Sequence, residues 1–163
     1  MNYLTAILAI CFLIGCKPDA SQQQFYHATT GKNNAILALS IDKNQFYGTY
    51  KVQYADDIID SGDVRGIVIG DTLRGRFNYI SYGGSQAVKP FLLLKSGDTL
   101  KQGSGFVYTY MKIPYYLPKS VVFKASDFQF LPIKTATYKA LDAKMKWLER
   151  YRLIKKALYV KHN

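Results

Sequence analysis

The chain has 163 residues, of which 48% are hydrophobic and 15% aromatic, and its 22 Lys and Arg outnumber its 11 Asp and Glu for a net charge of +11. This length allows one domain with a sizeable hydrophobic core. Both cysteines, Cys11 and Cys16, lie near the N-terminus. A thiol redox centre or a Cys-ligated metal is therefore excluded for the rest of the chain.

The N-terminal segment has the composition of an export signal. An apolar, uncharged run covers Tyr3–Gly15 and stops at Lys17. It is shorter than the roughly 20 apolar residues of a membrane-spanning helix, and its length fits the apolar region of a signal peptide. The run ends in Leu13-Ile14-Gly15-Cys16, which closely resembles the lipobox of bacterial lipoproteins. This resemblance implies that residues 1–15 are a signal peptide and that Cys16 is the acylated (palmitate-type) first residue of the mature protein.

Lipidation at Cys16 would place the domain in the cell envelope, held persistently by several acyl chains. Lys17 follows the cysteine where other lipoproteins carry a retention Asp, which by analogy indicates the outer membrane. Residues 16–34 are polar and rich in Gln, Thr and Asn. They are expected to form a tether, although Phe25 and Tyr26 can still dock on the domain.

The middle of the chain alternates β-branched and aromatic residues with short turns of Gly, Asp, Asn and Ser. Connections this short join antiparallel neighbours, because parallel strands need a long crossover. The pattern predicts an antiparallel meander within a domain over residues 35–134. Its expected strands are Ala35–Asp42, Gln45–Tyr54, Asp63–Ile69, Thr72–Tyr82, Val88–Lys95 and Gly103–Met111.

Three glycines share a strand face with aromatic or apolar residues. Gly48 alternates with Phe46 and Tyr50, and Gly66 and Gly75 occupy equivalent positions in later strands. A glycine inside a strand indicates a tight bend or a close approach of two backbones. The fold class expected is therefore mainly β, as a cupped meander sheet or a small barrel lined by Phe and Tyr, with a helix or loops closing one end.

After Met111 the strand pattern weakens. Pro114 and Pro118 exclude a central strand, since proline lacks the amide donor of a sheet. Short strands are expected at residues 120–124 and 128–131. A helix then begins at Thr135 or Thr137 and runs to about Tyr159, within a basic amphipathic segment at 135–163.

The C-terminal helix has two interpretations. Its aromatic and basic residues fit a contact with an anionic membrane surface through Lys146, Trp147, Arg150, Tyr151 and Lys155. Alternatively, its apolar stripe packs on the sheet and its lysines face water. Basicity of this kind can also mark nucleic-acid binding, but an export signal argues against such a partner.

Residues with catalytic or metal-binding chemistry are few. The histidines, His27 and His162, lie near the two ends of the chain, so a Ser-His-Asp site has no support. Four carboxylates, at Asp56, Asp57, Asp60 and Asp63, are the candidates for a calcium site. Their spacing does not match a known calcium loop, and a solvated hairpin loop is the preferred interpretation. We expect no cofactor and no enzymatic activity.

Two functions remain open at this stage. One is a non-catalytic structural or interaction role at the envelope. The other is a lipocalin-like barrel that binds a small apolar or aromatic ligand, for which the interior must be hollow rather than filled by its own Phe and Tyr.

The middle of the chain resembles small lipoproteins of unknown function from Bacteroidota. The motifs that carry the resemblance lie within residues 45–105: Tyr47-Gly48-Thr49-Tyr50, the glycines from Gly62 to Gly75, and Phe77-Asn78-Tyr79-Ile80-Ser81 followed by Gly and Ser. The chain lacks the Ser-x-Arg and late cysteine often found in that group. The resemblance implies a β-meander and an envelope location, and it assigns no catalytic residue.

Overall fold

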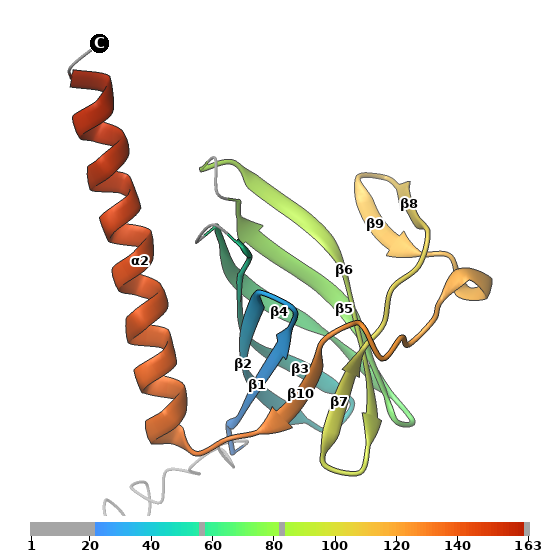
Figure 1. The fold of residues 1–163 in the computed structure, drawn as a ribbon. Helices are drawn as coiled ribbons and strands as arrows, with labels where there is room; N and C mark the ends of the chain where they lie inside the picture. Colours follow the sequence, from blue (N-terminus) through green and yellow to red (C-terminus); the bar gives the residue numbers. More distant parts are fainter. Residues whose placement is uncertain (1–21, 56–57, 82–83, 162–163) are drawn as a thin grey trace, which may run out of the picture.

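The computed structural model describes residues 22–55, 58–81 and 84–161, with side chains described as far as Ile154 (Figure 1). Strands dominate, and one long helix follows them. The elements are β1 (Gln24–Thr30), β2 (Asn33–Asp42), β3 (Gln45–Gln53), β4 (Ile59–Ile69), β5 (Thr72–Ile80), β6 (Gln86–Ser96), β7 (Thr99–Gln102), β8 (Val107–Tyr110), β9 (Ile113–Tyr116), the 3-10 turn η3 (Pro118–Ser120), β10 (Gln129–Pro132) and α2 (Thr135–Lys161).

Eight strands close into an antiparallel barrel in the order β1-β10-β7-β6-β5-β4-β3-β2. Strands β2 to β6 match five strands of the predicted meander, β1 and β7 extend it at its two ends, and β10 closes it by pairing with both β7 and β1. The prediction of a mainly β antiparallel fold with a C-terminal helix is confirmed, and the sheet closes completely. Cys16, the expected lipidation site, and the expected signal peptide at residues 1–15 lie outside the described residues.

The prediction of a tether over residues 16–34 is wrong for part of this range, because strand β1 occupies Gln24–Thr30. Gln24–Thr30 pairs along its whole length with β2, and the next strand begins at Asn33. Tyr26 and Ala28 are buried while their neighbours are more exposed. The alternation is thus real, but polar residues on the outer face make the segment look like a linker.

The expected strand at 103–111 is shortened to β8, which lies outside the barrel sheet. The barrel strand is β7, at Thr99–Gln102, and residues 103–128 then leave the barrel wall as an excursion. Within it, β8 and β9 pair only with each other. The expected strand at 120–124 is reduced to one bridge, between Ser104 and Val122. Pro114 is accommodated because β9 has a single strand partner.

The glycines allow neighbouring strands to approach closely. Gly66 of β4 lies directly opposite Gly75 of β5. A Cβ atom on Gly66 would lie 2.2 Å from the carbonyl oxygen of Arg74. A Cβ on Gly48 would lie 1.9 Å from the carbonyl oxygen of Ala38. Bare backbone at these places lets the sheet coil tightly enough to close.

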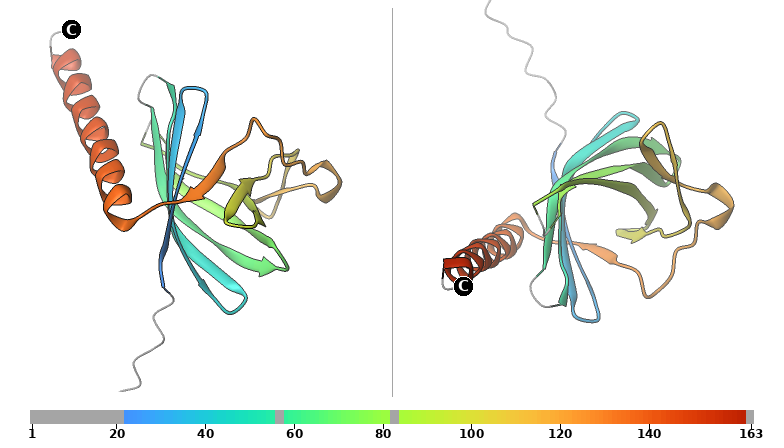
Figure 2. Two further views of the ribbon diagram at one scale, coloured as in Figure 1. Left: turned by 60° about the horizontal axis from the view of Figure 1, so that its bottom comes forward. Right: turned by 90° about the horizontal axis from the view of Figure 1, so that it is seen from above.

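The helix α2 packs on the outer wall of the barrel, where it contacts β1 and β2, and does not close an end (Figure 2). Ile36, Ile59 and Met145 form a buried cluster there, and partly buried apolar side chains of the helix pack against it: Tyr138, Leu141 and Leu148. The helix is therefore not the expected cap at a barrel end, because β2 carries the apolar Ile36 on its outer face, where the helix buries it. Within the described residues, no helix is both long and apolar enough to cross a bilayer.

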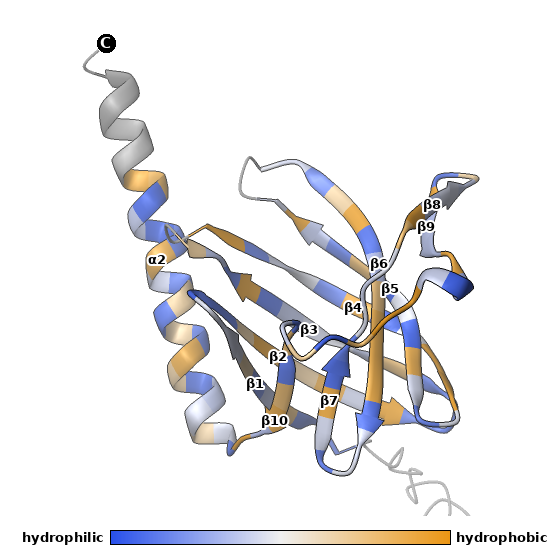
Figure 3. Cartoon of the chain, turned by 45° about the vertical axis from the view of Figure 1, so that its right-hand side comes forward, coloured by the Kyte–Doolittle hydropathy of each residue, from blue (hydrophilic) through white to orange (hydrophobic). Residues whose placement is uncertain are grey.

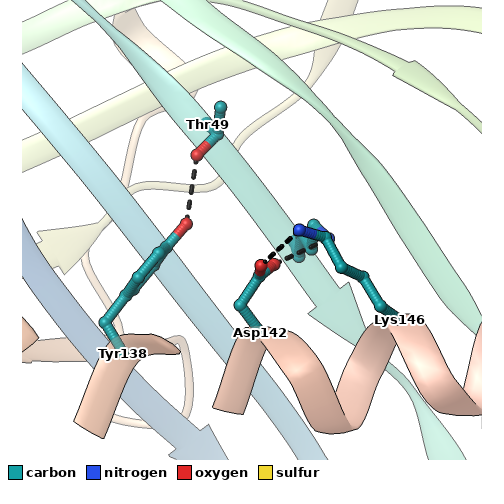
Figure 4. Close-up of polar contacts among 5 residues, drawn as sticks. Thr49, Tyr138, Asp142 and Lys146 are labelled. Atoms are coloured by element: carbon teal, nitrogen blue, oxygen red, sulfur yellow. Dashed lines mark hydrogen bonds and ion pairs between the residues drawn. The ribbon is translucent and has the colours of Figure 1, made fainter. Parts of the chain in front are cut away.

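Polar contacts fix the helix on the wall (Figure 4). Asp142 accepts from Lys51 of β3 at 2.8 Å and from Lys146 at 2.7 Å. The hydroxyl groups of Tyr138 and Thr49 are 3.1 Å apart. These contacts join the first half of the helix to β3, whereas the second half extends beyond them.

The Asp142 contacts make helix docking depend on pH. Partial burial acts to raise the pKa of Asp142, but the hydrogen bonds and positive charges of Lys146 and Lys51 outweigh it and lower the pKa. A carboxyl group whose pKa is lower in the folded state than in the unfolded state stabilises the fold at pH values above the unfolded-state pKa of about 4. This stabilisation is lost as the pH falls through the folded-state pKa. The urea midpoint of the wild-type chain should therefore fall between pH 5 and 3 by more than that of Asp142→Asn. Equal falls in both proteins would contradict this role.

Candidate functional site

The barrel interior is filled by its own side chains. Tyr50 lies at the centre, with its ring centroid 4.8 Å from that of Phe77, 5.3 Å from Phe91 and 5.9 Å from Phe130. Hydrophobic and hydrophilic residues alternate along the strands (Figure 3), as a one-sided core requires. The aromatic residues expected to line the barrel thus meet across its axis, and the arrangement favours a solid scaffold over a hollow carrier.

One end of the barrel carries a polar cluster around Lys89 of β6. Lys89 Nζ donates to the hydroxyl of Tyr54 at 3.2 Å and lies 3.8 Å from Asp60 Oδ2. The same ammonium lies 4.8 Å from the ring centroid of Tyr79 and 5.3 Å from that of Phe77. Tyr54 in turn donates to Asp60 at 3.3 Å. The cluster joins residues from or next to the four consecutive strands β3 to β6, so the pairing of these strands in the curved sheet assembles it.

In this cluster the positive charge of Lys89 is balanced by the carboxylate of Asp60. Burial lowers the pKa of Lys89, while the charge of Asp60 opposes that change. Burial and the neighbouring Asp60 raise the pKa of Tyr54, which therefore stays protonated at neutral pH and does not serve as a base. Each polar group has a partner inside the cluster. The arrangement can stabilise the end of the barrel at which the cluster lies. It places no activated nucleophile beside a base.

The four candidate calcium ligands do not gather in the described part of the chain. Asp60 points inward to Tyr54 and Lys89, whereas Asp63 is exposed, on the opposite face of β4. Asp56 and Asp57 lie outside the described residues. Among the described residues there is no group of three or more His, Cys, Asp or Glu that could hold a metal ion.

The described helix residues suggested for membrane contact occupy exposed positions that begin beside the docked Met145 and Leu148 of α2. Trp147 is 61% exposed and stacks on Tyr151, with ring centroids 5.3 Å apart. Arg150 is exposed, and Lys146 is held by Asp142. The side chain of Lys155 lies outside the described residues. The apolar stripe of the helix thus packs on the barrel, as the second interpretation expected, and the membrane contact of the exposed aromatic side chains stays a prediction.

Large exposed hydrophobic side chains are concentrated on the excursion. Its strands β8 and β9 form a hairpin that stands beside β6 (Figure 1). Phe106 is 75% and Met111 78% exposed, and all four residues of β8 are exposed. We call residues 106–117 the apolar hairpin. The large exposed hydrophobic side chains on it are Phe106, Val107, Tyr108, Tyr110, Met111, Ile113 and Leu117.

The tip of the apolar hairpin has an unusual composition. Met111 and Lys112 form its two-residue turn, with φ angles of 47° and 64°. Turns of this kind favour Asn-Gly, because a side chain in the left-handed region costs about 1–2 kcal/mol. The strained turn therefore presents an apolar and a basic side chain where small polar residues are usual. Sequence reasoning missed the hairpin, although a run of apolar residues without alternation around a Met-Lys pair was a readable signal.

Compared with known protein families, curated proteins and solved structures, the chain shows no significant match.

Proposed function

We propose that this protein is a non-catalytic, lipid-anchored component of the cell envelope, attached through Cys16, whose barrel is a filled scaffold and whose apolar hairpin makes a second contact with an anionic lipid surface. The exposed hairpin is the observation that carries the proposal. A contiguous exposed apolar surface marks an interaction site. The aromatic side chains that fill the barrel interior support the scaffold role over the lipocalin-like binding of a small ligand.

Three features favour lipid over protein as the surface bound. Both faces of β8 are exposed, and lipid can surround both, whereas a protein groove covers one. Residues 99–126 contain Lys101, Lys112, Lys119 and Lys124 but no Asp or Glu. Tyrosines that accompany lysines on an apolar element are typical of a membrane interface.

The second half of α2 has the same chemistry as the apolar hairpin. Trp147 and Tyr151 are exposed beside Arg150. Figure 1 places this half of the helix and the hairpin toward the same end of the barrel, opposite the end where β1 begins. Two aromatic and basic projections at one end are suited to a shared flat surface.

The length of chain before β1 permits both contacts on one bilayer. The eight residues from Cys16 to Gln23 span at most about 28 Å. A strand of 11 residues such as β4, tilted as in a small barrel, also has a height of about 28 Å. The tether can thus run the height of the barrel. An outer-membrane location, as Lys17 suggests, is part of this proposal.

Photo-cross-linking in intact cells tests the hairpin contact. A benzophenone side chain at Met111 should form adducts with phospholipid, detected by mass spectrometry of the hairpin peptide. The matched control is Lys43, which is also exposed in a two-residue turn with a φ of 53° but lies at the end where β1 begins. Adducts at Met111 with protein alone, or equal lipid adducts at both positions, would contradict the proposal.

Substitution of the anchoring residue tests the attachment. Cys16→Ser removes the thiol that lipidation requires, so the protein should take up no labelled fatty acid. It should also be extracted from membranes far more readily than the wild-type chain. Cys11→Ser, within the proposed signal peptide, is the matched control and should behave as wild type. Labelling of the Cys16→Ser protein, or absence of label from the wild type, would contradict lipidation at Cys16.

A further inference from the structure

Three arginines stand together on the outer wall of the barrel. Arg65 of β4 lies directly opposite Arg76 of β5. Arg74 lies two residues before Arg76 on the same face of β5, opposite the exposed Ile67. Directly opposed side chains on neighbouring antiparallel strands have Cβ atoms about 5 Å apart. The register therefore places three guanidinium groups in one patch.

The charge of this arginine patch is not balanced by the described residues around it. None of the three arginines forms an ion pair with another described residue. Asp63, two residues before Arg65, is the carboxylate closest along the same strand face, and it lies opposite Asn78. Like charges placed directly opposite each other destabilise a sheet. An arrangement that keeps such a repulsion is suited to an anion that would relieve it.

A groove opens beside the arginine patch. It has a volume of about 260 Å³ and lies between the outer wall of β5 and β6 and the excursion. Leu92 and Pro90 form part of it and lie opposite Arg74 and Arg76 respectively. Arg74 itself lines the groove, and the facing wall is largely aromatic: Tyr115, Tyr116 and Phe123.

We propose that the arginine patch and this groove form one binding site for a phosphate-bearing amphiphile. The phosphate would lie on Arg74 and Arg76, with Arg65 completing its charge balance, and the apolar part would enter the groove. A guanidinium group can bind phosphate through two parallel hydrogen bonds. Three guanidinium groups match the double negative charge of a phosphate better than the single charge of a carboxylate. The volume is below that of a drug-sized site and fits a ring or a short acyl segment.

This site goes beyond the proposed function, because it can operate whether or not the apolar hairpin touches a bilayer. The amphiphile could be a phospholipid of the bilayer or a free phosphorylated molecule. Both present the same chemistry to the arginines and the groove, and the experiment separates them.

Binding of dihexanoyl phosphatidic acid, which is soluble as a monomer, tests the site directly. The full chain is placed in nanodiscs of neutral phosphatidylcholine, and the phosphorus resonance of the probe is followed during titration. We expect Arg74→Gln and Arg76→Gln each to raise the Kd at least tenfold. Lys144→Gln removes one positive charge from an exposed site on α2 that takes part in neither proposed contact, and it should change the Kd less than twofold. Equal losses in all three variants, or no loss in any of them, would overturn the proposal.

The groove is tested separately from the charge. Val121 lines the groove, and Val121→Trp should fill part of it. This variant should weaken dihexanoyl phosphatidic acid at least fivefold and leave glycerol phosphate unaffected. If glycerol phosphate binds as tightly as the amphiphile to the wild-type chain, the groove takes no part and the proposed amphiphile is wrong.

The two sources are distinguished by the bilayer. In nanodiscs that contain long-chain phosphatidic acid, a site filled from the bilayer would no longer bind the soluble probe. A site that takes a free molecule would bind it unchanged. Either result, with the arginine dependence intact, supports the site, and loss of the Met111 lipid adducts would leave this experiment unaffected.

Discussion

Replacing Gly75 by alanine is expected to destabilise the barrel by about 3 kcal/mol, near the upper end of the cost of overpacking. The added Cβ would lie 2.1 Å from the carbonyl oxygen of Arg65 and 2.8 Å from the Cα of Gly66. Both neighbours are backbone atoms, so no side chain can rotate away. The strands β4 and β5 would have to separate where their backbones approach closely at Gly66 and Gly75.

A second glycine separates this packing effect from backbone conformation. Gly70 adopts a φ of 56° in the β4–β5 turn, and nothing lies within 4 Å of a Cβ built there. Gly70→Ala should therefore cost only the left-handed backbone term of about 1 kcal/mol. Urea unfolding followed by far-ultraviolet circular dichroism measures both. A cost for Gly75→Ala no larger than that for Gly70→Ala would contradict the close-approach argument.

The sheet could be predicted because its signals are local. Strand alternation has a period of two, and short Gly-Asp turns separate the strands, so the inward face of β3 and β5 is readable from Phe46, Tyr50, Leu73 and Phe77. The two-residue turn at Gly70-Asp71 even fixes the register that sets Arg65 opposite Arg76. The arginine patch was thus within reach of the sequence.

Closure and docking depend on distant pairings, which local signals do not encode. β1 and β10 have few residues in register with each other, Tyr26 with Pro132 and His27 with Leu131. The apolar stripe of α2 predicts that one face of the helix is buried. It does not predict that Ile36 of β2 and Ile59 of β4 cover that face, because both strands are distant from the helix in sequence. The Lys89 cluster likewise needs the register of β5 and β6, whose connection is longer than a tight turn.

Loss of the Phe130 ring tests the last link in the barrel. Phe130 is fully buried, and β10, which carries it, joins β7 to β1. Phe130→Ala should remove contacts with Tyr50 and Phe128 and leave a cavity at the point of closure. Deletion of a buried Phe ring costs about 4 kcal/mol, because the surroundings relax only partly.

The matched control for Phe130 lies in the apolar hairpin. Phe106 is 75% exposed, so Phe106→Ala should change the free energy of unfolding by less than about 0.5 kcal/mol. The contrast between two phenylalanines assigns one to the scaffold and the other to the surface it presents. If Phe130→Ala proved as mild as Phe106→Ala, the interior would have to be hollow or adaptable there. The lipocalin-like alternative would then regain its physical basis, since a carrier needs space that this ring now fills.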